Sequence, residues 1–194
     1  MTDPIERFAR WLEAAEASEP NDPNACALAT VGNGPDGRPF PDVRMVLLKG
    51  FDARGFVIYT NMMSAKGRQL RAIGQAALCF HWKTQRRQVR VRGAATEVDP
   101  AEADAYFASR QRASQLSAWA SIQSAPLDDR ATFEARLADI SARFPGDVPR
   151  PGDWTGVRVA AEAIEYWEDR EGRQHHRELF TRAGDGWAFS LLYP

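Results

Sequence analysis

Tight turns rich in glycine, aspartate and proline separate short β-rich runs early in the chain, and this pattern most constrains the fold. Residues 26–31, 43–49 and 56–60 are predicted strands, joined by the turn segments GNGPDGRP and GFDARG. Connections this short join antiparallel neighbours, because parallel strands need a crossover of a dozen or more residues. The pattern therefore predicts antiparallel hairpins rather than βαβ units.

Helix-start signals surround these strands. Asp3-Pro4 and Asp99-Pro100 each place a capping aspartate before a proline, Ser64 can cap a short helix, and Pro126 starts a longer amphipathic helix. A further helical stretch lies near residues 114–121. More strands are predicted at residues 76–82, 87–98, 155–160, 163–167, 178–182 and 187–192. Together these elements predict one α+β domain over residues 1–194: an antiparallel six- to eight-stranded sheet, curled into a barrel with surrounding helices.

Composition narrows the class of protein further. The chain has 194 residues, 44% hydrophobic and 26% charged, which is ordinary for one globular domain and argues against disorder. A formal net charge of -1 gives no global attraction to nucleic acid or to anionic lipid. The N-terminal residues contain no signal-peptide core, and no apolar run in the sequence is long enough for a membrane helix, so we expect a cytoplasmic protein. Cys26 and Cys79 lie in apolar runs and are expected to be buried, reduced thiols.

Three patterns that suggest other functions have simpler explanations. Residues 32–37 spell G-x-G-x-x-G, but a strand follows where a dinucleotide site needs a helix, so a hairpin loop is expected. His81, His175 and His176 make no recognisable zinc pattern with the two cysteines. In the basic run of residues 86–92, alternation places Arg86, Gln88, Arg90 and Arg92 on one face and Val89 and Val91 on the other. A polar face lining a ligand groove or a subunit interface explains this run as well as RNA would, and no aromatic platform for bases accompanies it.

Other cations are placed where a phosphate could bind. Arg44 and Lys49 bracket an apolar strand, and Lys66 lies in the first turn of the helix that follows Ser64. A helix N-terminus beside a cation is a natural phosphate site. Tyr106, Arg110 and Ser114 recur every four residues and would share a face if one helix continued through them. On spacing alone, a solvated helix with a single arginine explains that second group better.

Four groups of motifs, in this order, resemble the pyridoxamine 5'-phosphate oxidases. They are DPNACALATV with RMVLLKGFDARGFVIYTN, then FHWKTQRRQVRVRG, then YFASRQRASQLSAWASIQS, and finally IEYWEDREGRQHHR. The resemblance runs from about Asp3 to the C-terminus, and the ordered set is specific although no single motif is.

The resemblance implies an FMN-binding split barrel that acts as a homodimer, with two sites at the interface. It implies that FMN lies against residues 44–49, Tyr59 and Thr60, that Arg44 and Lys66 hold its phosphate, and that Gln88 bonds the flavin ring. Gln123, Ser124, Trp167 and Arg177 would complete the site from the partner subunit. The implied cofactor-binding residues are Arg44, Met45, Val46, Leu47, Leu48, Lys49, Tyr59, Thr60, Lys66, Gln88, Gln123, Ser124, Trp167 and Arg177.

The resemblance also implies the substrate site and the reaction. The substrate phosphate would meet Lys49, Tyr106, Arg110 and Ser114, while Arg173 and His175 would cover the pyridine ring as the catalytic residues. The implied activity is oxidation of pyridoxamine or pyridoxine 5'-phosphate to pyridoxal 5'-phosphate, with O2 as acceptor and H2O2 as product. Such a protein needs no metal, nucleic acid or membrane partner, and the flavin carries the redox chemistry.

Departures from the family pattern leave two alternatives open. Ala65, Gln174, His176 and Leu191 stand where members commonly have Arg, Leu, Asp and Arg, and members usually carry a segment before the first helix. One alternative is a related split-barrel flavin oxidase that acts on another aromatic substrate of the phenazine type. The other is a non-catalytic flavin-binding or pyridoxal phosphate-binding protein.

Overall fold

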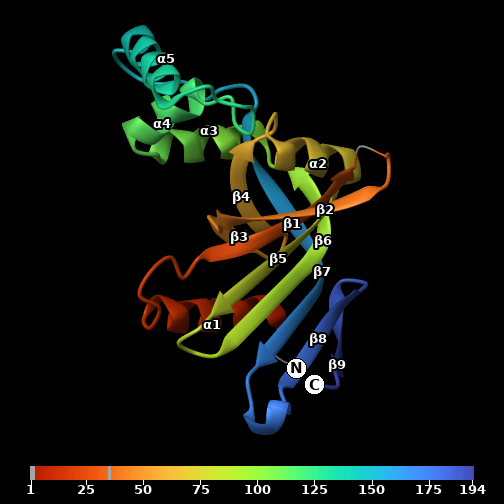
Figure 1. Ribbon diagram of the computed structural model, residues 1–194. Helices are drawn as coiled ribbons and strands as arrows, with labels where there is room; N and C mark the ends of the chain where they lie inside the picture. Colours follow the sequence, from red (N-terminus) through yellow and green to blue (C-terminus); the bar gives the residue numbers. More distant parts are fainter. Residues whose placement is uncertain (1–2, 35) are drawn as a thin grey trace.

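A computed structural model describes residues 3–34 and 36–194, and the described chain forms one antiparallel sheet with helices around it (Figure 1). The strands are β1 Ala25–Asn33, β2 Pro39–Leu47, β3 Gly50–Asp52, β4 Gly55–Asn61, β5 Gln75–Trp82, β6 Arg87–Glu97, β7 Trp154–Glu168, β8 His176–Ala183 and β9 Gly186–Leu191. The helices are α1 Pro4–Glu16, α2 Ala65–Ile73, α3 Pro100–Ser109, α4 Arg112–Ala120 and α5 Arg130–Arg143, with a 3-10 turn, η1, at Glu171–Arg173.

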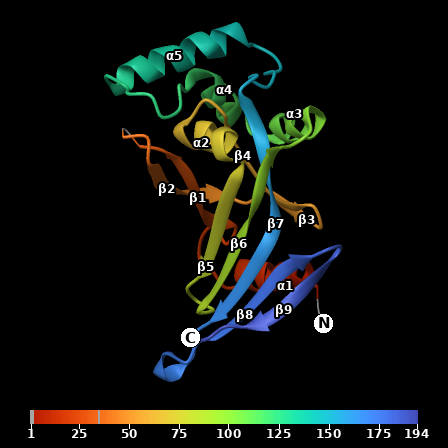
Figure 2. The same ribbon diagram turned by 90° about the vertical axis from the view of Figure 1, so that its right-hand side faces the viewer.

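The strand order curls the sheet and then splits it. Along the sheet the order is β2-β1-β5-β6-β7-β4-β3, and the chain passes directly from β2 to β3, so the two ends of the path meet. One edge of β7 pairs with β6, while its other edge pairs first with β4 and then with β8. The hairpin of β8 and β9 therefore leaves the barrel as a separate arm, which Figure 2 shows beside α1. This arrangement confirms the expected antiparallel split barrel.

The strand β7 is longer than the sequence suggested. Residues 155–160 and 163–167 were expected as two strands, but they are one, and β3 adds a short strand inside the expected GFDARG turn, which makes nine. The register shifts between Arg92 and Gly93, so Glu162 on β7 is an extra residue. A Cβ at Gly93 would lie 1.8 Å from the Ala160 carbonyl oxygen, so only glycine fits this bend.

Local capping signals explain where most helices begin. The Asp3 carboxylate accepts from the backbone nitrogen of Ile5 at 2.7 Å, and the Asp99 carboxylate accepts from Ala101 at 2.8 Å. The longest of these helices begins later than the sequence predicts, because α5 starts at Arg130 rather than at Pro126. Its cap is the Asp129 carboxylate, which accepts from Thr132 N at 2.7 Å.

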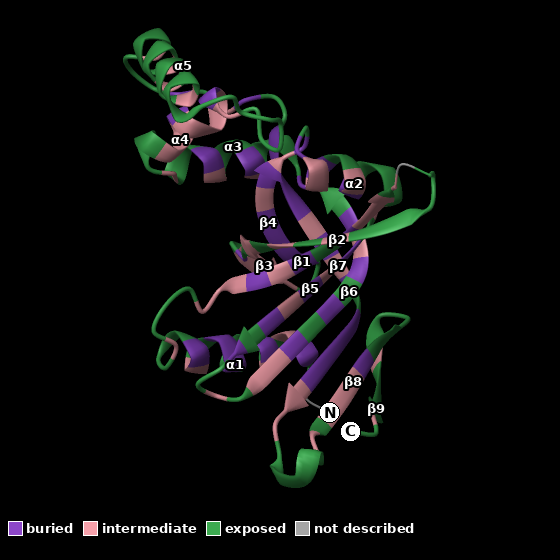
Figure 3. Cartoon of the chain, in the orientation of Figure 1, coloured by how far each residue is buried: buried purple, intermediate pink, exposed green. Residues whose placement is uncertain are grey.

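Aromatic rings fill the barrel where α1 covers it. The Phe8 ring lies 4.9 Å from each of Phe51, Phe56 and Phe80, in edge-to-face contacts. The Tyr166 hydroxyl donates to the Pro4 carbonyl at 2.6 Å and ties the start of α1 to β7. Figure 3 shows buried residues concentrated along the strands and on the inner face of α1. A second, smaller cluster that includes Phe107 and Trp154 packs α3 and α4 onto the start of β7.

Buried and exposed side chains alternate along β6, as the sequence indicated. Val89 and Val91 are fully buried, while Arg90 and Arg92 are exposed on the opposite face. Both cysteines are free thiols, although only Cys26 is buried and Cys79 is half-buried on the outer face of the sheet. Burial raises the pKa of Cys26 to about 12.

The first hairpin also has the expected form. Residues 32–37 run from the last two residues of β1 into its connection with β2, and Gly34 N donates to the Arg38 carbonyl at 2.7 Å. Pro35 lies outside the described residues. No helix of the described chain is both long enough and apolar enough to cross a membrane.

Candidate active-site cavity

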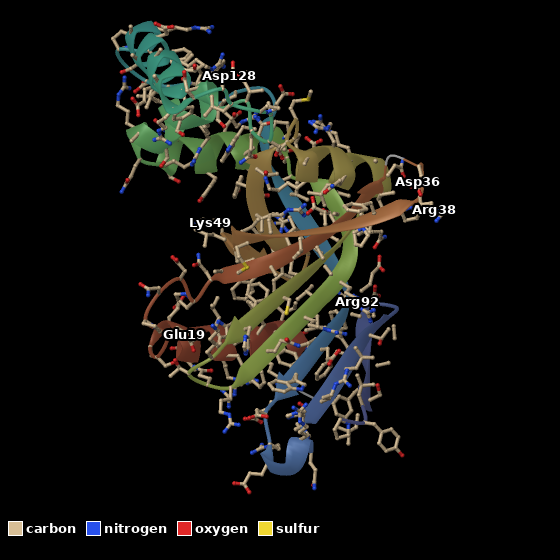
Figure 4. The ribbon with its side chains drawn as sticks, in the orientation of Figure 1. Glu19, Asp36, Arg38, Lys49, Arg92 and Asp128 are labelled. Atoms are coloured by element: carbon tan, nitrogen blue, oxygen red, sulfur yellow. The ribbon has the colours of Figure 1, made fainter. Side chains whose placement is uncertain are left out.

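A cavity of about 550 Å³ opens where β2, β4, α2, α3 and α4 come together at one end of the barrel (Figure 1). It brings together eleven residues that the sequence analysis had assigned to cofactor or substrate: Met45, Val46, Leu47, Lys49, Tyr59, Thr60, Lys66, Tyr106, Arg110, Ser114 and Gln123. The wall also contains Asn61, Ala113, Ser117, Ala118, Ser121 and Trp154, which it had not assigned. Figure 4 shows Lys49 beside β3, directly after β2.

One end of the cavity is the start of α2. Ser64 caps this helix by accepting from Gly67 N at 3.2 Å, and Lys66 follows in the first turn. The Lys66 ammonium donates to Gln123 Oε1 at 3.1 Å, and no carboxylate forms a salt bridge with it in the described chain. Burial lowers the pKa of Lys66, and the nearby Arg44 lowers it further while Asp42 opposes the change. The charged form of Lys66 is unfavourable without a partner, and the N-terminus of α2 is the positive end of the helix dipole. Both features favour an anionic ligand at this end of the cavity.

Arg44 is held differently from Lys66. Its guanidinium donates to the Leu28 carbonyl at 3.2 Å and to Thr30 Oγ1 at 2.5 Å, and it pairs with Asp42 at 2.5 Å. It does not belong to the cavity wall. The Asp42 pairing, which the sequence analysis missed, balances the Arg44 charge within the chain.

The opposite end of the cavity is an aromatic wall. The rings of Tyr59 and Tyr106 stack with centroids 3.9 Å apart, and Trp154 lies 5.3 Å from Tyr59 at an interplanar angle of 14°. Arg110 lies beyond the end of α3, in extended backbone, and α4 begins two residues later. Tyr106, Arg110 and Ser114 therefore do not share a continuous helix, yet the turn between the two helices brings all three into the same wall.

Arg110 is a half-buried cation without an acid. Its Nη1 is buried and has no hydrogen-bond partner among the described residues, and none of their carboxylates forms a salt bridge with it. Burial lowers its pKa, and nearby Tyr106 opposes the change. An unpaired buried donor is expensive unless a ligand satisfies it. The geometry therefore makes this end of the cavity a second place for an anion.

Five other predicted site residues gather elsewhere, at the end of β7 that leads into β8: Gln88, Trp167, Arg173, His175 and Arg177. Gln88, Trp167 and Arg177 are register neighbours across three strands, and the His175 ring lies 4.6 Å from the Trp167 ring. Figure 2 shows η1, which contains Arg173, at the far end of the molecule from α3 and α4. A single chain therefore does not bring Arg173 and His175 to the cavity of Lys49 and Arg110.

Carboxylates that the sequence analysis missed hold this second group. Glu165 is only 4% exposed and accepts from Arg177 Nε at 3.0 Å, while its other oxygen lies 2.7 Å from Arg90. The Asp169 carboxylate lies 2.9 Å from His175 Nδ1. Glu165 and Asp169 are separated in the sequence from Arg177 and His175 by several residues of the β7–β8 region. No short sequence motif therefore indicates these pairs.

Three further positions differ from the expected arrangement. Gln123 and Ser124 were expected to come from the partner subunit, but Gln123 contacts Lys66 of its own chain and Ser124 Oγ accepts from Ala65 N at 3.2 Å. Leu48 is buried in the core and is not part of the cavity wall. Among the described residues, no three His, Cys, Asp or Glu side chains form a group that could hold a metal ion.

Comparison with known proteins identifies the family. A family model described as pyridoxamine 5'-phosphate oxidase matches residues 12–144, and one described as the pyridoxine 5'-phosphate oxidase C-terminal dimerisation region matches residues 154–194. A protein of Gluconobacter oxydans named pyridoxine/pyridoxamine 5'-phosphate oxidase is 57% identical over 193 residues, covering 99% of this chain and 94% of its own. A protein of the same name from Sphingopyxis alaskensis is 58% identical, covering 99% of this chain and 88% of its own.

Solved structures agree with this result. The crystal structure of PhzG from Burkholderia lata, in complex with tetrahydrophenazine-1-carboxylic acid, has a TM-score of 0.90 at 30% identity and covers 100% of this chain and 94% of its own. An FMN-binding protein of Nostoc punctiforme has a TM-score of 0.76 at 21% identity, covers 100% of this chain and 98% of its own, and supports the fold alone. The two family models and the relatives that are more than half identical show that the chain belongs to the pyridoxamine 5'-phosphate oxidase family.

Proposed function

We propose that this protein oxidises pyridoxamine 5'-phosphate and pyridoxine 5'-phosphate to pyridoxal 5'-phosphate, using FMN and O2. The observation that carries the proposal is the pair of cations, Lys66 and Arg110, in one cavity with no carboxylate paired to either among the described residues. Two phosphate monoesters, one on a cofactor and one on a substrate, would pair with the cations at the two ends of the cavity. The names of relatives that are more than half identical support the same activity.

The residues present fit FMN. Lys66 and the N-terminus of α2 would hold its phosphate, because both offer unmatched positive charge to the same end of the cavity. Met45, Val46 and Leu47 would lie along the flavin, with backbone donors and apolar side chains on one strand. Bound FMN supplies a two-electron acceptor that dioxygen can regenerate with release of H2O2.

The substrate phosphate is assigned to the Arg110 end. Arg110, Tyr106 and Ser114 would donate to it, with Lys49 adding a second cation at the edge of the cavity. Fixing the phosphate at a distance from the reacting carbon places that carbon by geometry rather than by direct contact. For the amine substrate, one water is consumed and ammonia is released with the aldehyde; for the alcohol substrate, the aldehyde forms directly.

Completion of the site requires a second copy of the chain. We propose a homodimer in which Gln88, Trp167 and Arg177 of one subunit approach the FMN site of the other, with Arg173 and His175 over the substrate ring. The match of residues 154–194 to a dimerisation region supports this arrangement. The exposed apolar side chains of Val43, Met45 and Leu47 on β2 offer a surface for such contact. Arg173 would orient the substrate, and His175, held by Asp169, would position it or relay a proton.

Both matched regions are proposed to form one domain, since β7 from the second region pairs with β4 and β6 from the first. A location in the cytoplasm stays a prediction.

The activity is tested by loading the purified protein with FMN and adding pyridoxamine 5'-phosphate in air. Pyridoxal 5'-phosphate, followed by its absorbance, and H2O2 should form in equal amounts. A yellow, FMN-loaded protein that produces neither would reject the proposal. Replacing both Arg173 and His175 with alanine should abolish turnover, whereas a binding protein without catalysis would show no activity to lose.

A second candidate function follows from the structural match to PhzG. Under it, the cavity would take an unphosphorylated aromatic acid instead of a phosphorylated pyridine. The Arg110→Ala variant separates the two, because it should raise the KM of a phosphorylated substrate strongly and leave an unphosphorylated tricyclic substrate nearly unaffected.

A further inference from the structure

We infer that Trp154 is a positioning residue that holds Arg110 for the phosphate of the substrate. This inference rests on the proposed function and adds a residue to its substrate site. The guanidinium carbon of Arg110 lies 4.8 Å from the centroid of the Trp154 ring and 5.6 Å from that of Phe107. Both distances lie within the range of cation–π attraction. The support of this cation is therefore aromatic rather than carboxylate.

Neighbouring arginines show the contrast. Arg158 pairs with Glu102 at 2.8 Å and with Asp52 at 3.1 Å, and Arg150 pairs with Asp104 at 2.6 Å. These three carboxylates are thus engaged with arginines outside the cavity wall. Arg110, which lines the cavity, has an aromatic neighbour instead.

The choice of support changes what the cation can do. A carboxylate would hold the guanidinium but would also occupy its donors and cancel its charge. A ring attracts the face of the guanidinium and leaves the N–H groups at its rim available. Arg110 lines the cavity, no carboxylate of the described residues pairs with it, and its buried Nη1 has no hydrogen-bond partner among them.

Trp154 is itself held firmly enough to act as a support. It is 7% exposed, and its ring makes an edge-to-face contact with Phe107 at 5.0 Å. Its carbonyl accepts from Arg150 Nη1 at 2.7 Å, and its backbone nitrogen donates to the Pro151 carbonyl at 3.0 Å. The side chain therefore has a fixed position, and Arg110 is fixed relative to it.

The FMN-loaded protein is tested with 4-deoxypyridoxine and its 5'-phosphate, in which C4' is a methyl group that cannot be oxidised as the amine or alcohol substrates are. The measured quantity is the ratio of the two Kd values, from the change in flavin absorbance. Trp154→Leu should raise Kd for the phosphate ester about tenfold, as expected for a lost cation–π pair in a partly desolvated site, and change Kd for the free ligand less than about twofold. Trp154→Phe, which keeps a ring, should fall between wild type and Trp154→Leu.

Two further variants separate positioning from a general structural effect. In the Arg110→Ala background, adding Trp154→Leu should change the ratio no further, because the group that Trp154 holds is already gone. Trp187→Leu is the matched control, since it removes a tryptophan that lies 4.0 Å from the Arg182 guanidinium outside the cavity, and should leave both Kd values unchanged. Thermal unfolding of each variant verifies that it is folded; if Trp154→Leu is not, Trp154→Phe alone and with Arg110→Ala carries the test.

The outcomes distinguish the two levels of the argument. If wild type does not prefer the phosphate ester, the proposed substrate is wrong and this inference fails with it. If wild type prefers it but the Trp154 variants keep the same ratio, the proposed function stands and the positioning role is refuted. Equal weakening of both ligands, or an undiminished effect in the Arg110→Ala background, also refutes it.

Discussion

Replacing Lys66 with methionine should separate FMN binding from folding. Lys66 donates to Gln123 and lies beside Ser64, and burial lowers its pKa, so its charge is unfavourable in the protein without ligand. Methionine keeps the length and the apolar stem of the side chain while removing the charge. We therefore expect weaker FMN binding and little change in the stability of the FMN-free protein.

The magnitude follows from the contact that is lost. A hydrogen bond between a cation and a charged ligand contributes about 1.5–3 kcal/mol, which corresponds to roughly 10- to 150-fold in Kd. The stability of the FMN-free protein should stay within about 1 kcal/mol of wild type, because the exposed Gln123 oxygen can bind water instead. Ser64 keeps its bond to Gly67 N at 3.2 Å, so the cap of α2 remains.

The pH dependence has a defined sign. The lowered pKa of Lys66 means that, between that pKa and 10.5, the unfolded chain holds a proton that the folded FMN-free protein does not. Stability contributed by this group should therefore rise with pH in that window. FMN affinity should fall over the same window, because only the charged lysine pairs with the phosphate. Lys66→Met should lose both trends.

The assay is quenching of FMN fluorescence on titration with FMN-free protein, with thermal unfolding of the same samples. Lys83→Met is the matched control, because it is the identical substitution at an exposed turn position. Wild-type affinity in Lys66→Met would place the cofactor phosphate elsewhere. A large loss of stability without FMN would instead mean that Lys66 supports the fold.

Three more predictions follow from the packing. A Cβ at Gly156 would lie 2.8 Å from Val98 Cγ2 and 2.9 Å from Tyr59 Cε1, so Gly156→Ala should displace both side chains. We expect a cost of about 1–3 kcal/mol in thermal unfolding and weaker FMN binding, whereas unchanged values would mean that the wall adapts. Glu165→Gln should lower the free energy of unfolding in urea by about 1–3 kcal/mol, because the partly exposed Arg177 loses a charged acceptor; equal stability would show the pair to be neutral. Cys26, with its pKa raised to about 12, should react with a thiol reagent at pH 8 only after the protein unfolds. Its contribution to the stability of the folded protein should fall as pH rises from about 9 to 12. Rapid labelling of both thiols in the native protein would contradict this.

Much of the local structure could be predicted, because it depends on residues close together in the chain. The aspartate caps of α1 and α3 act within three residues, and the alternation of Val89 and Val91 with exposed arginines acts within one strand. The sequence predicts the start of α5 too early, at Pro126. A proline is compatible with the first turn of a helix, but the capping hydrogen bond is made by Asp129. The length of β7 was also missed, because Gly93 on the neighbouring strand accommodates its extra residue.

The candidate site shows the same division. By itself, the sequence determined the strand and helix pattern, the family resemblance and the types of residue able to meet two phosphates. Only the tertiary structure decided that Lys66 and Arg110, 44 positions apart by their numbers, line one cavity. It also decided that the Trp154 ring lies 4.8 Å from the Arg110 guanidinium and that His175 lies elsewhere in the same chain. The physical reason is that capping and alternation act over a few residues. The cavity instead depends on long-range strand pairing and on the packing of α3 and α4 against β7.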